Sequence, residues 1–433
     1  MCILKLYKKE KYYETSSKNV RSHNIPSFPS DGYTFLCSVG GGIFDSGKNL
    51  KQEIDAETRN YTESWLDHAS GSFSGEGTEE EPYLISSAAD LAAISATVNE
   101  KRFEHYWEDT YFRQTADIDL SGYLWHPIGE WGYFFSANYD GCGYTISNMY
   151  CKDFVYGGLF GACYGSNLSN INVKSSIVEN CAMAGGIVTY NSGWETVQNC
   201  TADTMIINAR TAGGIICASS GCVIEGCVYT GTINSAAEGE SLERVDYIGG
   251  ILGSGGKCTV RNCYNYGAII AENAISIGGI VGTAESDAVE NCIQNGVIYI
   301  KSTKDNAFVG AFIGQSNIYD NGDVSSVRNS EGQGNIIIKS GALATSQNAT
   351  FENCVFRGSH SYGAKYAFSS ANSITSCYAI CNGEKFYSRG GDFADFRIMP
   401  EINNGLPVPV SLYHIAAFGQ SVPSSFWGEY NYL

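Results

Sequence analysis

Hydrophobic residues in this chain form short runs that recur at a regular distance. Each run begins with a Gly-Gly pair and continues with branched or large apolar residues, and successive runs begin 28, 28, 36, 29 and 32 residues apart. A period of this length indicates a repeat architecture rather than a series of unrelated domains. The copies are Gly157-Gly158-Leu159-Phe160-Gly161, Gly185-Gly186-Ile187-Val188, Gly213-Gly214-Ile215-Ile216, Gly249-Gly250-Ile251-Leu252-Gly253, Gly278-Gly279-Ile280-Val281-Gly282 and an altered sixth, Gly310-Ala311-Phe312-Ile313-Gly314.

A second feature follows each Gly-Gly pair at a fixed distance. It comes 13 or 14 residues after each of the first five starts and is, in most copies, an Asn followed by an apolar residue or Cys. Two features that keep this phase over five copies identify one repeating unit. The copies are Asn170-Ile171, Asn199-Cys200, Gly226-Cys227, Asn262-Cys263 and Asn291-Cys292, with continuations at Asn329-Ser330, Asn353-Cys354 and Ser376-Cys377.

The segments between these features are typical of short strands. Leu168–Val173, Thr259–Cys263 and Asn295–Ile300 are rich in β-branched residues, partly alternate in polarity, and are bounded by Gly, Asn or Ser. No segment of the repeat region keeps a helical period for the roughly 10–12 residues that a helix needs. Short strands stacked unit upon unit predict an all-β fold, a parallel β-helix (β-solenoid) of about ten coils over residues 75–400.

Stacking explains why the same residue types recur. Coils about 4.8 Å apart place equivalent residues in columns along the axis. We expect Gly where the backbone takes a positive φ or where two sheets approach closely. We expect Asn at a corner in the left-handed conformation, where its amide can form a ladder. The Cys that follows the Asn should point inward as a small apolar residue.

The segment before the repeat predicts a helical cap. From Ser87 to Val98 the apolar residues Leu91, Ile94 and Val98 have helical spacing. Ser87 suits the N-cap position and Asp90 follows three residues later, which is close to a capping box. An amphipathic helix here would cover the open edge of the first coil.

These patterns divide the chain into four predicted parts. Residues 1–64 are an irregular N-terminal extension, 65–125 are the N-terminal cap and first strands, 126–400 are the solenoid repeat domain, and 401–433 are a C-terminal tail or cap. The N-terminal residues include basic side chains but no apolar run of about 7–15 residues, so no signal peptide is visible in the chain.

Composition narrows the classes of partner. The chain has 433 residues, of which 50 are Gly and 8 are Pro, and its 45 acidic and 27 basic residues give a net charge of −18. This charge repels phosphate backbones and anionic lipids, so we expect no nucleic-acid partner. No apolar run approaches the roughly 20 residues that span a bilayer, so we expect no membrane insertion. We expect a monomer.

Several segments from Trp65 onward match a known family of repeat proteins. They are Phe73 to Ile85, Ala116 to Gly122, Trp125 to Gly129, Tyr139 to Ile146, Gly158 to Gly161 and the ending Asn403 to Pro407. Through these segments the chain resembles the GLUG-motif proteins, which are repeat proteins of bacterial surfaces. The resemblance is specific over about 75–300 and weaker as far as Pro407. It implies a right-handed β-solenoid at the cell surface or in secreted form, and it brings no catalytic residues.

Acidic residues near the start of the repeat form one candidate site. Asp117 and Asp119 lie two apart in a strand-like stretch and should face the same side, with Glu130 and Asp140 nearby in the sequence. They could hold Ca²⁺ or form an acid–base pair of a glycosidase. The simpler interpretation, which we favour, is that Asp117 and Asp119 cap turns of the first coil.

Cysteines and tyrosines form two further candidates. Cys222, Cys227, Cys258 and Cys263 could bind zinc or form two bridges. Stacked Cβ atoms would lie near the coil spacing of about 4.8 Å, wider than a disulfide allows, which favours a buried column of thiols. Tyr229, Tyr264, Tyr266 and Tyr299 could line a ligand-binding flank, although packing in columns between coils is the favoured interpretation.

Together these patterns predict a non-enzymatic adhesion or display protein that binds a glycan or a protein along its side. We assign no catalytic residue, no cofactor-binding residue, no metal site and no cofactor. The alternatives are a carbohydrate-active β-helix enzyme, such as a polysaccharide lyase or glycoside hydrolase, and a trimeric phage fibre or spike. The enzyme would need several charged residues that converge on one strand face.

Overall fold

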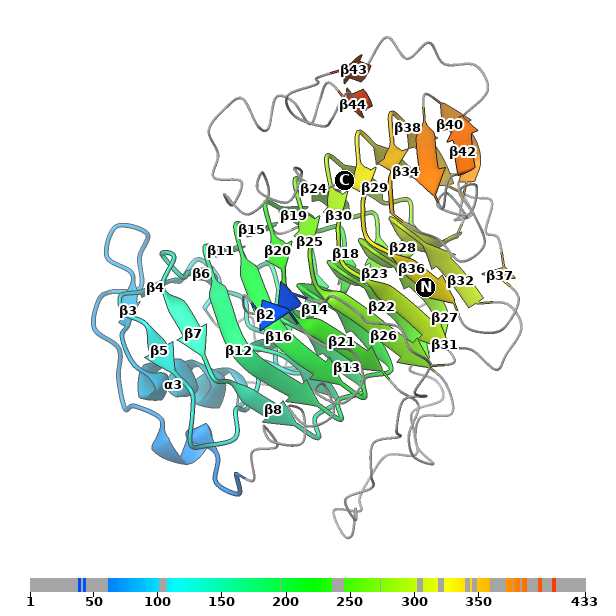
Figure 1. The fold of residues 1–433 in the computed structure, drawn as a ribbon. Coiled ribbons are helices and arrows are strands. Elements are labelled where there is room, and N and C mark those ends of the chain that lie inside the picture. The colour runs from blue at the N-terminus through cyan, green and yellow to red at the C-terminus, as the bar shows by residue number, and fades with distance from the viewer. Residues whose placement is uncertain are drawn as a thin grey trace.

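The fold is a parallel β-solenoid closed at its N-terminal end by a helix, as predicted (Figure 1). The computed structural model describes residues 61–100, 107–194, 196–235, 245–272, 274–301, 307–317, 323–338, 349–358 and shorter stretches up to 409. Most of the N-terminal extension and of the C-terminal tail therefore lies outside the described residues. The short strand pairs there are antiparallel: β1 (Ser38–Val39) with β2 (Gly42–Ile43), and β43 (Phe396–Ile398) with β44 (Pro407–Pro409).

Four sheets run along the solenoid, and successive coils add strands to them; the two shorter sheets begin only at Tyr156 and Phe160. Apart from β42, every strand in these sheets pairs in parallel with its equivalent in the neighbouring coils. The six-stranded sheet consists of β10 (Phe160–Tyr164), β14 (Val188–Ser192), β18 (Ile216–Ser220), β23 (Leu252–Gly256), β28 (Val281–Glu285) and β33 (Ile313–Asn317). The seven-stranded sheet consists of β9 (Tyr156–Gly157), β13 (Met183–Gly185), β17 (Thr211–Gly213), β22 (Val245–Gly249), β27 (Ala274–Gly278), β32 (Ala307–Gly310) and β37 (Leu343–Ala344).

The other two sheets are longer and begin in the cap. The eleven-stranded sheet consists of β3 (Tyr83–Ile85), β4 (Tyr111–Gln114), β6 (Asn138–Asp140), β11 (Leu168–Ser169), β15 (Thr196–Gln198), β19 (Val223–Glu225), β24 (Thr259–Arg261), β29 (Ala288–Glu290), β34 (Ser325–Arg328), β38 (Ala349–Glu352) and β40 (Ala371–Thr375). The sixteen-stranded sheet consists of β5 (Ile118–Asp119), β7 (Thr145–Ser147), β8 (Tyr150–Lys152), β12 (Asn172–Glu179), β16 (Thr201–Ile207), β20 (Val228–Tyr229), β21 (Thr232–Ser235), β25 (Tyr264–Asn265), β26 (Ala268–Glu272), β30 (Ile293–Gln294), β31 (Ile298–Lys301), β35 (Glu331–Gly332), β36 (Ile336–Ile338), β39 (Val355–Phe356), β41 (Tyr378–Cys381) and β42 (Glu384–Tyr387).

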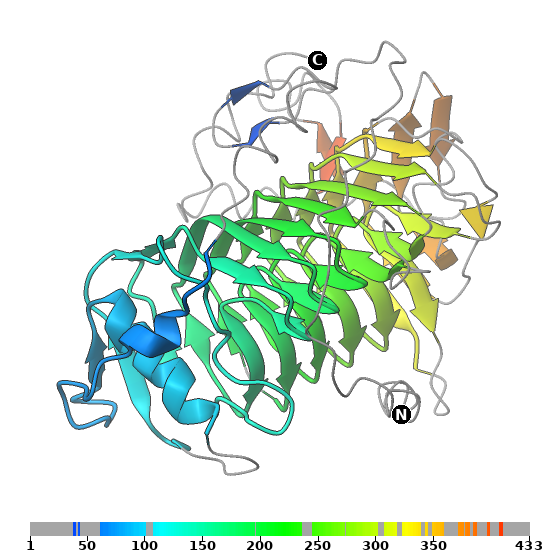
Figure 2. The same cartoon turned by 90° about the horizontal axis from the view of Figure 1, so that it is seen from below.

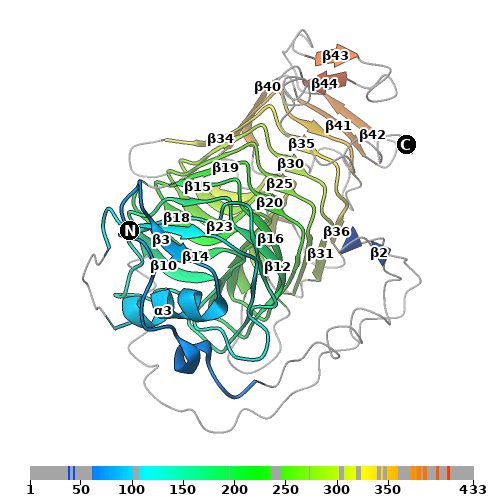
Figure 3. The same cartoon turned by 90° about the vertical axis from the view of Figure 1, so that its left-hand side faces the viewer.

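The predicted cap helix is α3 (Ala88–Val98), which follows the short 3-10 helix η1 (Trp65–His68). The hydroxyl of Ser87 accepts a hydrogen bond from the backbone N–H of Asp90 (3.2 Å), as an N-cap should. Leu91, Ile94 and Val98 are buried against the first coils. Figure 2 shows α3 at the N-terminal end of the stack, and Figure 3 shows it lying across the front of the coils.

The paired glycines are required because backbones approach closely at this corner. A Cβ atom on Gly213 would overlap the carbonyl oxygen of Ile216, and one on Gly214 would overlap the carbonyl oxygen of Gly250 in the next coil. Neither glycine has a positive φ. Gly is therefore needed at this corner because backbones approach closely, and not because the backbone takes a positive φ. Ile215, directly after the pair, is fully buried in the main core.

The Asn corner has the predicted left-handed backbone. Six asparagines that follow the eleven-stranded sheet have φ between 51° and 55°. The side-chain amide of Asn291 donates to Oδ1 of Asn262 (3.4 Å), which is the expected ladder between coils. Gly226 replaces Asn in one coil, and there Oε1 of Glu225 accepts from Asn262 instead (3.3 Å). The six are Asn170, Asn199, Asn262, Asn291, Asn329 and Asn353.

We expect Gly213→Ala to destabilise the protein strongly, because the added methyl group would meet backbone atoms that cannot move independently. The free energy of unfolding should fall by about 3 kcal/mol or more. Gly71→Ala is the matched control, since a Cβ atom there has no neighbour within 4 Å. Urea denaturation followed by circular dichroism measures both variants; equal stability of the two would contradict the close-approach explanation.

Candidate functional site

The acidic residues near the start of the solenoid lie on its outer surface and accept hydrogen bonds from the backbone. Asp117 and Asp119 are both exposed on either side of buried Ile118, so they face the same side as predicted. Oδ1 of Asp119 accepts from the backbone N–H of Ser121 (3.0 Å), which supports its interpretation as a turn cap. Oδ1 of Asp117 instead accepts from the backbone N–H of Thr145 (2.8 Å) in β7 of the next coil, so this residue links two coils and does not cap a turn.

Asp140 has a similar role. Its Oδ1 accepts from the backbone N–H of Cys142 (2.8 Å) and from the side chain of Asn170 (2.8 Å). These hydrogen bonds outweigh partial burial and lower the pKa of the Asp140 carboxyl. The backbone of Glu130 is bonded to Tyr133 in a separate loop. Among the described residues, no three His, Cys, Asp or Glu side chains are grouped so that they could hold a metal ion.

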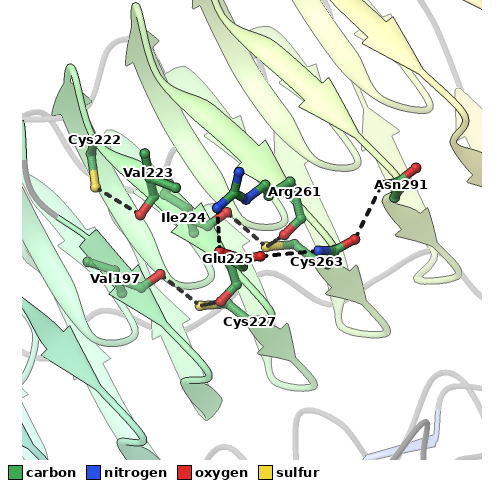
Figure 4. Close-up of polar contacts among 10 residues, drawn as sticks. Val197, Cys222, Val223, Ile224, Glu225, Cys227, Arg261, Cys263 and Asn291 are labelled. Atoms are coloured by element: carbon green, nitrogen blue, oxygen red, sulfur yellow. Dashed lines mark hydrogen bonds and ion pairs between the residues drawn. The ribbon is translucent and has the colours of Figure 1, made fainter. Parts of the chain in front are cut away.

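The four candidate cysteines belong to two buried columns (Figure 4). Cys258 stacks on Cys222, since the N–H of Thr259 donates to the carbonyl of Cys222 (2.9 Å). Cys263 stacks on Cys227 in the same way, through the N–H of Tyr264 (2.9 Å). Figure 4 shows Cys222 and Cys227 on one coil and Cys263 on the next.

Each thiol in the second column has a backbone carbonyl as its partner. The Sγ atom of Cys263 lies 3.2 Å from the carbonyl oxygen of Arg261, and that of Cys227 lies 3.4 Å from the carbonyl oxygen of Glu225. Burial raises the pKa of the Cys263 thiol well above its usual range, so it stays protonated. Thirteen cysteines in the described part of the chain are free thiols, and all except Cys142 are buried.

The tyrosines named from the sequence do not form an exposed stripe. Tyr229 is fully buried and its hydroxyl donates to the carbonyl of Thr204 (2.8 Å). Tyr264 and Tyr266 are half-buried with parallel rings, 6.4 Å between centroids. Tyr299 is half-buried as well. For Tyr229 the prediction of packing between coils is confirmed. The alternative prediction, that Tyr229 lines an exposed ligand-binding flank, is wrong because the side chain of this β20 residue points into the core.

Exposed aromatic rings gather elsewhere, on a loop of the first coil. Ile128 and Phe135 form bridges to Phe160 and Cys163 of β10, so six residues of the first coil lie opposite two of the next. The excess projects as a loop closed by hydrogen bonds between Glu130 and Tyr133 (2.9 and 2.8 Å). Gly129 and Gly132 have positive φ, which this tight loop requires.

Four aromatic rings are in contact at this loop, and we call them the aromatic patch: Trp131, Phe134, Tyr164 and Tyr190. The ring of Trp131 meets those of Phe134 and Tyr190 at centroid distances of 5.7 and 5.5 Å, and Phe134 meets Tyr164 at 6.1 Å. Tyr190 lies between Ala162 and Ala218 in its column, and these small neighbours leave room for the larger rings.

The aromatic patch is open to solvent at its two ends. Trp131 is 41% exposed and Tyr164 is 42% exposed, whereas Tyr190 forms the floor at 7%. A further exposed ring is that of Trp194, which is 85% exposed and follows Ser192, the register partner of Tyr164, by two residues. The ring of Trp194 lies against Gly221 of the following coil. Exposed aromatics gathered in this way are typical of binding surfaces.

The sequence contains a signal for this patch that the repeat pattern does not capture. The local signal is a Trp in a short segment bounded by glycines, Gly129-Glu130-Trp131-Gly132, which precedes the first Gly-Gly copy at Gly157. A turn that carries a large apolar residue at its tip indicates a displayed ring. Trp131 and Trp194 are not repeated at the equivalent positions of other coils, so a search for recurring residues does not find them.

One buried carboxyl group takes the place of a cysteine in a column. Asp287 occupies the position of Cys222 and Cys258 in the following coil and is 1% exposed. Its Oδ1 accepts from the N–H of Cys258 (2.6 Å) and its Oδ2 from the N–H of Glu285 (3.2 Å). Burial raises the pKa of Asp287 to about 8, although the two N–H groups oppose this shift.

Comparison with known proteins finds relatives that are similar to parts of this chain. No family model matches the chain. A protein of Evansella cellulosilytica, provisionally named a Gly-rich membrane protein, is 33% identical over 123 residues, which are 27% of this chain and 12% of that protein. Halomucin of Haloquadratum walsbyi is 29% identical over 195 residues, 41% of this chain and 2% of halomucin. The chain thus spans a small fraction of the curated relatives it matches.

Among solved structures, the chain aligns with a protein of Bacteroides ovatus provisionally named an immunoglobulin A1 protease. The TM-score is 0.41 and the identity 18%, and the alignment covers 77% of this chain and 94% of that one. No helix in the described residues is long and apolar enough to cross a membrane.

We expect the column thiols to be inaccessible in the folded protein. Iodoacetamide should leave Cys227, Cys263 and Cys292 unmodified under native conditions and should alkylate all three in guanidinium without a reductant, because they are buried thiols and not disulfides. Peptide mass spectrometry measures the modification at each site. Cys142, which is exposed, serves as the internal control. Alkylation in guanidinium only after reduction would contradict the thiol column.

We expect Asp287 to make stability depend on pH. Its folded pKa is about 8, above the ordinary value of 3.8, so the folded state binds a proton that the unfolded state releases. The free energy of unfolding should therefore fall as pH rises from 5 to 8, by up to about 1.4 kcal/mol per pH unit. Urea denaturation across this range should show a flatter profile for Asp287→Asn. Identical slopes in the two proteins would exclude this carboxyl as the cause.

Proposed function

We propose that this chain is a non-enzymatic module of a cell-surface or secreted protein, and that it attaches to its ligand through the aromatic patch and Trp194. The solenoid provides a rigid support, since every coil is bonded to the next by parallel backbone ladders. The proposal rests on one observation above all: the rings of Trp131, Tyr164 and Trp194 are displayed on the flank of this support.

The similarities found by comparison support an exterior location. One relative is named a Gly-rich membrane protein and the other halomucin, and both are far longer than the matched segments. The resemblance to the GLUG-motif proteins of bacterial surfaces points the same way. A module within a large exterior protein would project its flank towards other cells or surfaces.

The carbohydrate-active enzyme receives no comparable support. Its candidate carboxylates, Asp117 and Asp119, accept hydrogen bonds from backbone N–H groups of the next coil and of an adjacent turn. A glycosidase needs one carboxyl group with a raised pKa to protonate the leaving group. Within the part of the chain that the structure describes, the carboxyl with a strongly raised pKa is that of Asp287, and it is enclosed in the core.

We expect adhesion to depend on the exposed tryptophans. Beads coated with the protein should retain cells from a panel of bacterial and epithelial lines, and the double variant Trp131→Ala/Trp194→Ala should lower retention about tenfold or more on the lines that bind. Tyr144→Ala is the matched control, because Tyr144 is an exposed aromatic (39%) at a different corner. Retention that is equal for the double variant and the parent protein would refute the assignment to this patch.

A further inference from the structure

The size of the exposed rings limits the kind of ligand. At exposures of 41%, 42% and 85%, Trp131, Tyr164 and Trp194 together present about 400 Å² of aromatic surface. A stable protein–protein interface buries about 800 Å² on each partner. The surface is therefore about half of what a folded protein partner needs, and it suits a smaller ligand that is held by a few rings.

The shape of the surface favours an elongated ligand. Trp131, Phe134 and Tyr164 follow one another at centroid distances of 5.7 and 6.1 Å, and Trp194 lies beyond Tyr164 on the next coil. Trp131 and Phe134 meet edge to face, with 77° between their planes, and Phe134 and Tyr164 are tilted by 51°. Several exposed rings on one flank offer separate stacking positions to a chain of flat, weakly apolar units.

Polar groups accompany the rings. The carboxylate of Glu130 is exposed beside Trp131, the hydroxyl of Ser192 is half-exposed beside Tyr164, and Ser220 is exposed next to Ser192 in the same column. Hydroxyl and carboxylate oxygens accept hydrogen bonds from ligand hydroxyls. Aromatic surface with a few hydrogen-bonding groups is the usual composition of a site for a small polar ligand.

Charge selects among such ligands. The chain carries a net charge of −18, and the residue before Trp131 in the loop is the exposed Glu130. This field repels sulfated, phosphorylated or uronic-acid chains, and the repulsion is screened by salt. We infer that the aromatic patch and Trp194 bind a neutral oligosaccharide, whose sugar rings stack on Trp131, Tyr164 and Trp194. This inference rests on the proposed function and specifies its ligand.

The first test is a titration with defined sugars. The purified protein is titrated with neutral hexasaccharides of glucose, mannose, xylose and N-acetylglucosamine, and with hexagalacturonate as an anionic probe. Tryptophan fluorescence should change saturably with at least one neutral sugar, at an affinity at least tenfold above that for hexagalacturonate. Trp194→Ala should weaken binding about tenfold and Trp194→Phe should retain most of it, because Phe keeps an aromatic face. Trp194 is 85% exposed, so neither change threatens folding.

The second test separates this inference from the proposed function. Cells that bind the protein are treated with periodate, which cleaves the vicinal diols of sugars, and retention is measured again. Loss of patch-dependent retention supports the neutral glycan. Patch-dependent retention that survives periodate, with no sugar binding, overturns the glycan and leaves the adhesion module standing. Saturable sugar binding at Trp194 without any patch-dependent cell retention supports the glycan site and overturns adhesion as the function.

Discussion

The structure depends on the close approach of backbones at the Gly-Gly corner. Parallel ladders set the distance between coils, and at this corner a Cβ atom on Gly213 or Gly214 would occupy the place of a carbonyl oxygen in its own or the neighbouring coil. The next residue then enters the core, as Ile215 does. Because each coil must meet this condition at the same point, the chain repeats the same residues at the same phase.

The same stacking makes every side-chain position a column, and columns tolerate only certain substitutions. The Asn corner accepts Gly226 because both residues adopt a positive φ, and Glu225 then supplies the missing acceptor. The thiol column accepts Ser330, whose hydroxyl donates to the carbonyl of Arg328 (2.9 Å) as the thiols do to theirs. Asp287 is a larger departure, since it places an ionisable group among buried thiols.

The recurring residues predicted the fold because they reflect a condition that every coil shares. The Gly-Gly and Asn-Cys features located the corners, and Leu91, Ile94 and Val98 located the cap helix. The aromatic patch and Trp194 could not be found in this way, because Trp131 lies on an insertion in one coil and Trp194 in one turn. Tyr229 was misleading for a related reason: its column is regular, but regularity does not show which side of a strand faces the core.

The buried thiols have a consequence for where the protein can fold. None of the thirteen cysteines in the described part forms a disulfide. Backbone hydrogen bonds, and not oxidised cysteines, hold neighbouring coils together along the thiol columns. The described solenoid therefore has the same covalent connectivity in a reducing cytosol as in oxidising surroundings.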